Sequence, residues 1–385
     1  MASIFLPRII RSGGGALADL PDALAQLGLR SPFIVTDAFL AGSGLLDRLL
    51  AVLDEAGLSH GVFTGTLADP TTLVIDAALE AMAGGSYDCV LGFGGGSPID
   101  TAKAVAVRAQ RTIAYDAMRA PAQIDEPGLP IIAIPTTAGT GSEATRFTII
   151  TNEATQEKML CMGLAFMPSI AIVDFELTLG KPRRLTADTG IDSLTHAIEA
   201  YVSRKANPFS DAMALSAMRL ISANLRTACM EPGNRAARAG MMEGAHHAGI
   251  AFSNASVALV HGMSRPIGAL FHVPHGLSNA MLLPIVTAFS TGSALGRYAD
   301  CARAMALIDA AEGDQAAVAA LLSELERLNA DLEVPTPRDY GIDRDQWFGN
   351  IPLMARQAIA SGSPGNNPRI AEVEEIEELY HRVWA

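Results

Sequence analysis

Four short apolar runs in the first 180 residues constrain the fold of this chain more than any other feature. They are continuous rather than alternating, which is typical of parallel strands that are covered on both faces. The runs are Pro32–Asp37, Cys89–Phe93, Pro130–Pro135 and Ser169–Asp174. Helical patterns such as Leu45–Ala56 and Thr71–Ala83 lie between them. This alternation predicts an open, doubly wound α/β domain with a Rossmann-like parallel sheet.

A hairpin and a long helical region are predicted in addition to this sheet. A β-hairpin is expected within Thr145–Met162, with the arms RFTIIT and KMLCM joined across NEATQE. From about Lys181 onward, long segments rich in Ala, Leu and Met have helical spacing instead. The expected helices include Asp188–Ser203, Asp211–Cys229, Arg235–Ser253 and Asp314–Leu332. We therefore predict an α/β domain over residues 1–180 and an all-α domain over residues 181–385.

Composition and charge argue against several classes of function. The 385-residue chain has a formal net charge of −13 and no block of Lys and Arg, so neither a nucleic-acid partner nor an anionic membrane surface is expected. No apolar run reaches about 18 residues, so no transmembrane helix is expected. The apolar stretch near the N-terminus is broken by Pro7 and Arg8 and is too short for a signal peptide. The four cysteines form no CxxC pair, which is typical of free thiols in a reducing compartment, and we expect a cytoplasmic protein.

A glycine-rich turn follows the second predicted strand. The segment Cys89–Lys103 reads CVLGFGGGSPIDTAK, which joins a strand to a helix with Pro98 in its first turn. We call Gly94–Ser97 the glycine turn. Free N–H groups at such a helix start, together with the helix dipole, favour an anion such as the pyrophosphate of a dinucleotide. An ordinary strand-to-helix turn is the alternative, and the segment lacks the GxGxxG fingerprint.

A second loop, rich in hydroxyl groups, follows the third predicted strand. This threonine loop, Pro135–Glu143, reads PTTAGTGSE. The carboxyl ends of parallel strands meet at the edge of the sheet where ligands bind, so the two loops predict a nucleotide crevice. Asp37 closes the first strand at that edge, where a carboxylate accepts hydrogen bonds from a ribose diol and repels the 2′-phosphate of NADP. The alternatives are that the hydroxyls serve only the turn and that Asp37 is a capping residue.

A carboxylate and several imidazoles in the helical half suggest a metal site. Asp192 and His196 are four residues apart in GIDSLTHAIEAYVS, so both lie on one helix face. His261, His272 and His275 follow within a short segment. One carboxylate with imidazoles suits Fe²⁺, Zn²⁺, Co²⁺ or Ni²⁺, and such an ion lowers the pKa of an alcohol and polarises a carbonyl. Packed structural histidines are the alternative.

Taken together, these segments resemble the iron-containing (group III) alcohol dehydrogenase family over nearly the whole chain. The likeness is carried by GGGSPID, PTTAGTGSE, IDSLTHAIEAYVS, GIAFSNASVALVHGMSRPIGALFHVPHG and NPRIAEVEEIEELYHRVW. The resemblance implies a dinucleotide-binding α/β domain, an all-helical C-terminal domain and an active site in the cleft between them, an architecture like that of dehydroquinate synthase. It also implies a homodimer or a higher homo-oligomer.

The resemblance further implies a role for individual residues. The metal ligands would be Asp192, His196, His261 and His275, with Fe²⁺ as the metal or, alternatively, Zn²⁺ or another divalent ion. Gly95, Gly96 and Ser97 would hold the pyrophosphate of NAD. The other nucleotide contacts would be Asp37, Asp100, Thr136, Thr137, Thr140, Thr145 and Lys158. Phe252, in AFSN, would line the substrate pocket near the nicotinamide.

Arg265 departs from the family pattern. Many members have a proton-relaying histidine four residues after the first of the C-terminal metal histidines, and here that position is Arg265. A guanidinium does not deprotonate at working pH, so the proton would pass through water, a ribose hydroxyl or His272. Arg265 could instead bind an anionic group of the substrate, or pair with an acidic residue, or line a solvent channel. Our hypothesis is a small alcohol or aldehyde that carries a carboxylate, sulfonate or phosphonate.

The expected activity is metal-dependent hydride transfer between NAD(H) and a small alcohol or aldehyde. The sequence does not indicate whether alcohol oxidation or aldehyde reduction is the physiological direction. One alternative is a lyase like the dehydroquinate synthases, which also combine NAD with a metal, and another is a non-catalytic cofactor-binding protein. The pairing of Asp192 with His196 and the PHG segment favour the alcohol dehydrogenases.

Overall fold

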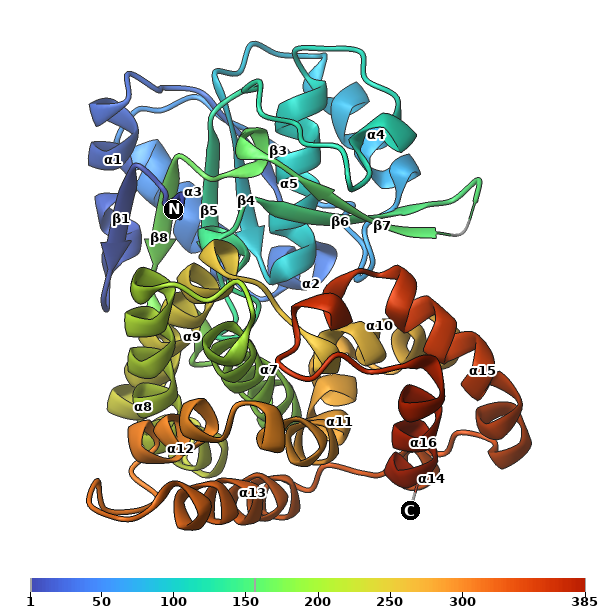
Figure 1. Cartoon of the computed structure of the whole chain (residues 1–385). Helices are drawn as coiled ribbons and strands as arrows, with labels where there is room; N and C mark the ends of the chain where they lie inside the picture. The colour runs from blue at the N-terminus through green and yellow to red at the C-terminus, as the bar shows by residue number, and fades with distance from the viewer. Residues whose placement is uncertain (1, 156, 385) are drawn as a thin grey trace. The chain divides into compact units, whose positions relative to one another are not determined.

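A computed structural model describes residues 2–155 and 157–384 of the chain. These residues form two compact units (Figure 1). Of the described residues, the α/β unit comprises residues 5–155 and 157–180, and the helical unit comprises residues 181–384 together with the short segment 2–4. Each unit has its own elements and its own core, and each is described below by itself.

A six-stranded parallel sheet is the centre of the α/β unit over its described residues. In spatial order its strands are β1 (Ile9–Ser12), β8 (Ile170–Val173), β5 (Ile131–Pro135), β4 (Cys89–Gly94), β2 (Pro32–Val35) and β3 (Gly61–Phe63). The chain runs from β2 to β3 at one edge and later from β4 to β5 on the other side of β2. The direction of winding therefore reverses between β2 and β4, which is where open α/β sheets bind ligands at their carboxyl ends.

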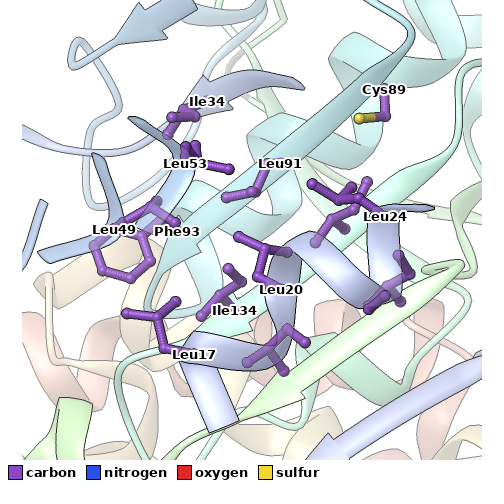
Figure 2. Close-up of a cluster of buried hydrophobic side chains, with 14 of the residues drawn as sticks. Leu17, Leu20, Leu24, Ile34, Leu49, Leu53, Cys89, Leu91, Phe93 and Ile134 are labelled. Carbon is purple, nitrogen blue, oxygen red and sulfur yellow. The ribbon is translucent and has the colours of Figure 1, made fainter. Parts of the chain in front are cut away.

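Helices cover both faces of this sheet, which explains why the central strands are apolar at every position. Every residue of β2, β4, β5 and β8 is buried. The first face packs against α1 (Leu20–Gln26), α2 (Ala38–Gly42) and α3 (Leu45–Glu55), and Figure 2 shows Leu20, Leu49 and Leu53 beside Leu91 and Phe93. The other face packs against α4 (Thr72–Met82), α5 (Gly96–Arg108) and α6 (Tyr115–Met118). The predicted doubly wound parallel sheet is confirmed.

The predicted hairpin is present as β6 (Phe147–Asn152) and β7 (Glu157–Met162), which pair in antiparallel fashion. Its connection contains Gln156, which lies outside the described residues. The hairpin packs through Ile150 and Met159 on the core that α5 also covers. Two strands, β1 and β3, were not predicted. Both are short, partly exposed edge strands, so neither has the buried apolar run that marks the central strands.

The helical unit contains helices and no strand among its described residues, as predicted. Its helices are α7 (Arg183–Val202), α8 (Pro208–Met230), α9 (Arg235–Asn254), α10 (Leu259–Phe271), α11 (His275–Ser290), α12 (Leu295–Ala304), α13 (Asp314–Asp331), α14 (Pro337–Tyr340), α15 (Arg344–Ala360) and α16 (Val373–Val383). Helix α7 lies beside α8, α9 and α11 (Figure 1). Most of its residues are buried. A helix buried in this way can present polar side chains to the interior only if they are partnered there. Among the described residues, no helix combines the length and the apolarity that crossing a membrane would require.

Candidate active site

The glycine turn joins β4 directly to α5. Gly94 has φ +156°, and a side chain there would collide with the ring of Pro98. A Cβ at Gly92 would lie 2.8 Å from the Cα of Ile99, so the strand and the helix also approach closely. Gly95 begins the helix without a side-chain cap, which leaves the first N–H groups of α5 available to a ligand. This is the local geometry that binding of a pyrophosphate requires.

The threonine loop lies against the glycine turn. The N–H of Thr136 donates to the carbonyl of Gly94 at 2.8 Å, and a Cβ on Gly96 would lie 3.1 Å from the methyl group of Thr140. The hydroxyls of Thr136 and Thr137 are buried and have no hydrogen-bond partner within the part of the chain that the structure describes. A buried hydroxyl without a partner is unfavourable, so these two groups are suited to donate to a bound ligand.

Three of the predicted nucleotide contacts already have partners inside the α/β unit. Asp37 caps α2, since its Oδ1 accepts from the N–H of Leu40 at 2.8 Å. The hydroxyl of Ser97 donates to the carbonyl of Ala68. Lys158, on β7, forms an ion pair of 2.8 Å with Asp69. Asp37 and Ser97 lie at the carboxyl edge as predicted, and Lys158 would have to share its charge with Asp69 to contact a nucleotide.

Asp100 and Thr145 have internal roles around a buried lysine. The Nζ of Lys103 donates to the carbonyl and the hydroxyl of Thr145, at 2.8 and 3.0 Å, and to the carbonyl of Phe147 at 2.7 Å. Burial lowers the pKa of Lys103 to about 8, although Asp100 opposes this shift. Burial raises the pKa of Asp100 to about 6, against the opposing charge of Lys103. These side chains tie α5 to the end of the threonine loop, and a direct contact of Asp100 or Thr145 with the nucleotide stays a prediction.

The predicted metal ligands come together in the helical unit. Among the described residues, one group could hold a metal ion, namely Asp192, His196, His261 and His275, whose ligand atoms all lie within 4.8 Å of one another. We call these residues the metal cluster. Asp192 and His196 come from α7, His261 from α10 and His275 from the start of α11. All are buried except His275, whose side chain is 49% exposed. His272, in contrast, is not part of the group.

The metal cluster fits a divalent ion. The Oδ1 of Asp192 lies 3.5 Å from Nε2 of His261, 3.8 Å from Nε2 of His275 and 3.9 Å from Nε2 of His196. Ligands bound tetrahedrally at about 2.1 Å would be about 3.4 Å apart, so the four ligand atoms, which lie within 4.8 Å of one another, would move closer together around an ion. One carboxylate and three imidazoles suit Fe²⁺ or Zn²⁺.

The charges of the metal cluster are strongly coupled. Burial alone would raise the pKa of Asp192, but His196, His275 and His261 together hold it well below its usual range. Burial alone would lower the pKa of His261, but Glu199 and Asp192 raise it to about 9. A metal ion that binds here at neutral pH must therefore displace a proton.

Two polar residues that sequence reasoning missed support the cluster. The carboxylate of Glu199, on α7, accepts from Nδ1 of His261 at 2.6 Å. The amide of Asn279, on α11, donates to Oδ1 of Asp192 at 2.6 Å. Both follow a residue of the metal cluster at helical spacing, Glu199 three residues after His196 and Asn279 four residues after His275. That spacing was an available signal, because residues three or four apart share a helix face.

The predicted substrate-side residues lie on two helices, Phe252 on α9 and Arg265 on α10, with His272 at the end of α10. The ring of Phe252 stacks on His196, with ring centroids 4.3 Å apart. Arg265 lies one turn after His261 on α10 and is half-buried, and its NH1 is 3.5 Å from the carbonyl of Ser361. In the described residues no carboxylate forms an ion pair with Arg265, and burial lowers the pKa of its guanidinium although Glu199 opposes the shift. His272 is exposed and ends α10 in the left-handed conformation, with φ +54°.

Comparison with known proteins identifies the family. Residues 7–175 match the family model described as iron-containing alcohol dehydrogenase, and residues 186–384 match that of the C-terminal part of the Fe-containing alcohol dehydrogenase family. The parallel sheet with its uncapped glycine turn and the carboxylate–imidazole cluster of the helical unit fit a dinucleotide-linked metalloenzyme. The chain belongs to the iron-containing alcohol dehydrogenase family and is a metal-dependent, NAD-linked oxidoreductase of CH–OH groups.

Individual relatives cover essentially the whole chain. Lactaldehyde reductase of Escherichia coli (strain K12) is 35% identical over 379 residues, which is 97% of each chain. The crystal structure of a 1,3-propanediol oxidoreductase is similar with a TM-score of 0.95 and 34% identity, over 100% of both chains. The structure of sulfoacetaldehyde reductase from Bifidobacterium kashiwanohense in complex with NAD⁺ gives a TM-score of 0.90 and 30% identity, over 100% of this chain and 99% of the other. These matches favour the dehydrogenase over the lyase and non-catalytic alternatives.

Proposed function

We propose that this chain interconverts a small alcohol and its aldehyde that carry an anionic group, with NAD(H) as the hydride carrier. The observation that carries this proposal is Arg265, a half-buried guanidinium without a carboxylate partner in the described residues, one helical turn from the metal ligand His261. The work of the protein is to orient the substrate, to stabilise charge and to exclude water from the reacting groups.

The metal cluster would hold Fe²⁺, or alternatively Zn²⁺ or another divalent ion. When bound, such an ion supplies a positive charge that favours the deprotonated alcohol and polarises the aldehyde carbonyl. Phe252, stacked on His196, gives the site an apolar wall beside this charge, and we assign it to the substrate pocket. His272 and water are our candidates for carrying the proton to solvent, since His272 is exposed and Arg265 cannot act as a base.

The carboxyl edge of the sheet would bind NAD. Gly95, Gly96 and Ser97 would hold the pyrophosphate at the start of α5, with Thr136, Thr137 and Thr140 beside it and Lys158 as a further contact. Asp37 would meet the adenosine ribose and disfavour the extra phosphate of NADP. Lys103 and its partners Asp100 and Thr145 would keep the two loops together.

The lack of an ion-pair partner for Arg265 in the described residues supports an anionic substrate, although the charge of Glu199 also acts on this guanidinium. A desolvated guanidinium usually has a carboxylate or phosphate partner, because a buried charge is otherwise costly. The forked N–H groups of Arg suit a carboxylate, sulfonate or phosphonate in particular. One relative with a solved structure, sulfoacetaldehyde reductase, is named for an anionic aldehyde. We also propose a cytoplasmic homo-oligomer, and the cytoplasmic location is supported by four free, buried cysteines.

Matched substrates test the role of Arg265. We would measure kcat/KM for aldehydes of equal length that end either in an anionic group or in a neutral one, in the wild type and in Arg265→Ala. The variant should lose about 10- to 100-fold for the anionic series, the range expected for charge-assisted hydrogen bonds, and less than about 3-fold for the neutral series. Arg338→Ala, at a side chain that is 64% exposed in the same unit, is the control. An equal loss of kcat/KM in both series, or no loss in either, would show that Arg265 does not recognise the negative charge of the substrate.

A further inference from the structure

Glu199 is a buried carboxylate that is not itself one of the four residues of the metal cluster. It is 3% exposed, and in the described residues it forms an ion pair with His261 but with no Lys or Arg. Burying a carboxylate is unfavourable unless hydrogen bonds satisfy both of its oxygens. The bonds that Glu199 accepts therefore indicate what it does.

One set of these bonds caps a helix. Helix α10 begins at Leu259 after Ala258, which provides no side-chain cap of its own. The Oε2 of Glu199 accepts from the N–H of Ala258 at 2.8 Å, and Oε1 accepts from the N–H of Val260 at 2.6 Å. These are N–H groups at the start of a helix, which otherwise lack partners. Glu199, on α7, thus fixes the first turn of α10, and negative charge is favourable at that end of a helix.

The remaining bond reaches the metal ligand itself. The Oε2 of Glu199 lies 2.6 Å from Nδ1 of His261. An ionised carboxylate can only accept, so Nδ1 must carry the proton of this bond. In the neutral imidazole the lone pair is then on Nε2, the atom that lies 3.5 Å from Oδ1 of Asp192 inside the metal cluster. The same oxygen therefore sets the tautomer of His261 and holds the helix on which it lies.

We propose that Glu199 is a positioning residue for the metal centre, which acts by capping α10 and by holding the Nδ1–H tautomer of His261. The inference rests on the proposed ligand set. It also explains the order of this segment, because His261 falls in the turn that Glu199 caps and Arg265 falls in the next one. Partners of this kind orient metal-binding histidines and increase their basicity.

The test uses Co²⁺ as the probe, because its visible absorption reports the ligand geometry. Glu199→Gln keeps the shape of the side chain but replaces one acceptor by a donor. In one orientation, the amide NH₂ of the glutamine faces the N–H of Val260. In the other orientation, it faces the N–H of Ala258 and the Nδ1 proton of His261. Two donors then face each other in either case. We expect Co²⁺ affinity, measured by competition with a chelator, to fall 10- to 100-fold with an altered spectrum.

Glu324→Gln is the matched control. Glu324 is an equally buried carboxylate of the helical unit, its side chain 3% exposed, but it pairs with Arg226 at 2.6 Å and with Arg327. The Glu324→Gln variant should be less stable than the wild type, yet its Co²⁺ affinity should stay within about 2-fold of the wild-type value. Wild-type affinity and spectrum in Glu199→Gln would overturn the proposal, and so would an equal loss in both variants. A wild-type chain that binds no Co²⁺ would overturn the ligand set, and the inference with it.

A second measurement needs no variant at Glu199, in case that variant does not fold. In the Zn²⁺-loaded wild type with ¹⁵N-labelled histidine, His261 should show a metal-bound Nε2 and a slowly exchanging, strongly hydrogen-bonded proton on Nδ1. A metal-bound Nδ1, or an Nδ1 proton that exchanges as fast as that of an exposed imidazole, would overturn the proposal.

Discussion

Asp37 combines two roles that a single substitution can separate. Its Oδ1 caps α2 at 2.8 Å from the N–H of Leu40, and its charge is the proposed barrier to NADP. Asn is as good a helix cap as Asp, so Asp37→Asn removes the charge and keeps the cap. We expect the ratio of kcat/KM for NAD to that for NADP to fall by at least about 10-fold, as for the loss of about 1.4 kcal/mol of discrimination. Initial rates with NAD and with NADP measure this ratio.

A matched cap provides the control for Asp37. Asp343 caps α15 in the same way, with its Oδ1 2.9 Å from the N–H of Gln346. Asp343→Asn makes the same chemical change in the helical unit and should leave the cofactor ratio unchanged. If Asp37→Asn also leaves the ratio unchanged, the carboxylate serves the cap alone and cofactor choice lies elsewhere.

At the scale of residues, the sequence predicts the candidate metal ligands better than it predicts the residues that hydrogen-bond to them. Asp192 and His196 are readable because a carboxylate and an imidazole four apart share a helix face. His261 and His275 could be assigned only through the family resemblance, since nothing in their spacing selects them over His272. The spacing of Glu199 from His196 indicates a shared helix face but not its partners, because these lie on α10, far away in sequence.

At the scale of elements, helix α11 depends on a side chain from another helix. Pro284 lies inside α11 and has no N–H, so the carbonyl of Ala280 lacks its usual partner. The amide of Asn329, on α13, donates to that carbonyl at 2.7 Å. Asn329→Leu should therefore cost about 1–3 kcal/mol in the free energy of unfolding, the usual penalty for an unpaired buried group. Denaturant unfolding with a constant m-value would measure this loss.

Asn350 is the corresponding control for Asn329. Its amide donates to the carbonyl of Gln346 within α15, in an exposed position where water can replace it. Asn350→Leu should change the free energy of unfolding by less than about 0.5 kcal/mol. Similar effects of the two substitutions would mean that the bond to Ala280 contributes nothing beyond an ordinary surface contact.

The prediction of helices and strands succeeded for the fully buried strands and the long helices, and it failed for the partly buried edge strands. The central strands were readable because they are covered on both faces, and the long helices because their apolar positions recur with helical spacing. Strands β1 and β3 lie at the edges of the sheet and are only partly buried, so their short segments resemble loops. The pairing of β1 with β8 joins distant parts of the chain, and no local signal encodes it.

At the scale of the whole molecule, the two proposed ligand sites belong to different units. The glycine turn and the threonine loop belong to the α/β unit, and the metal cluster belongs to the helical unit. The residues of the metal cluster come from α7, α10 and α11, so an ion bound there would tie these helices to one another. A ligand that binds only the folded state stabilises it by an amount that grows with its affinity. Removal of the metal should therefore destabilise the helical unit first.

This effect should depend on pH through His261. Burial would lower its pKa, but Glu199 and Asp192 raise it from 6.5 to about 9 in the metal-free protein. Between these values the metal-free folded state holds a proton that the unfolded state lacks, so this contribution to its stability is lost as pH rises towards 9. The metal-bound state does not hold that proton, and its affinity for the ion rises as proton competition declines. The gap in stability between the two forms should widen by up to about 1.4 kcal/mol per pH unit for this single proton.

Hydrogen exchange with and without a chelator, at pH 7 and pH 8.5, tests this linkage. Metal removal should speed exchange in α7, α10 and α11 more at pH 8.5 than at pH 7, after correction for the intrinsic rates. Exchange in β4, β5 and α5 should respond to NAD instead, because that ligand would bind at the ends of these elements. An effect of the chelator that is equal at both pH values would show that no proton leaves His261 on metal binding. An effect spread evenly over both units would show that they unfold as one cooperative body, in which case each ligand would stabilise the whole chain.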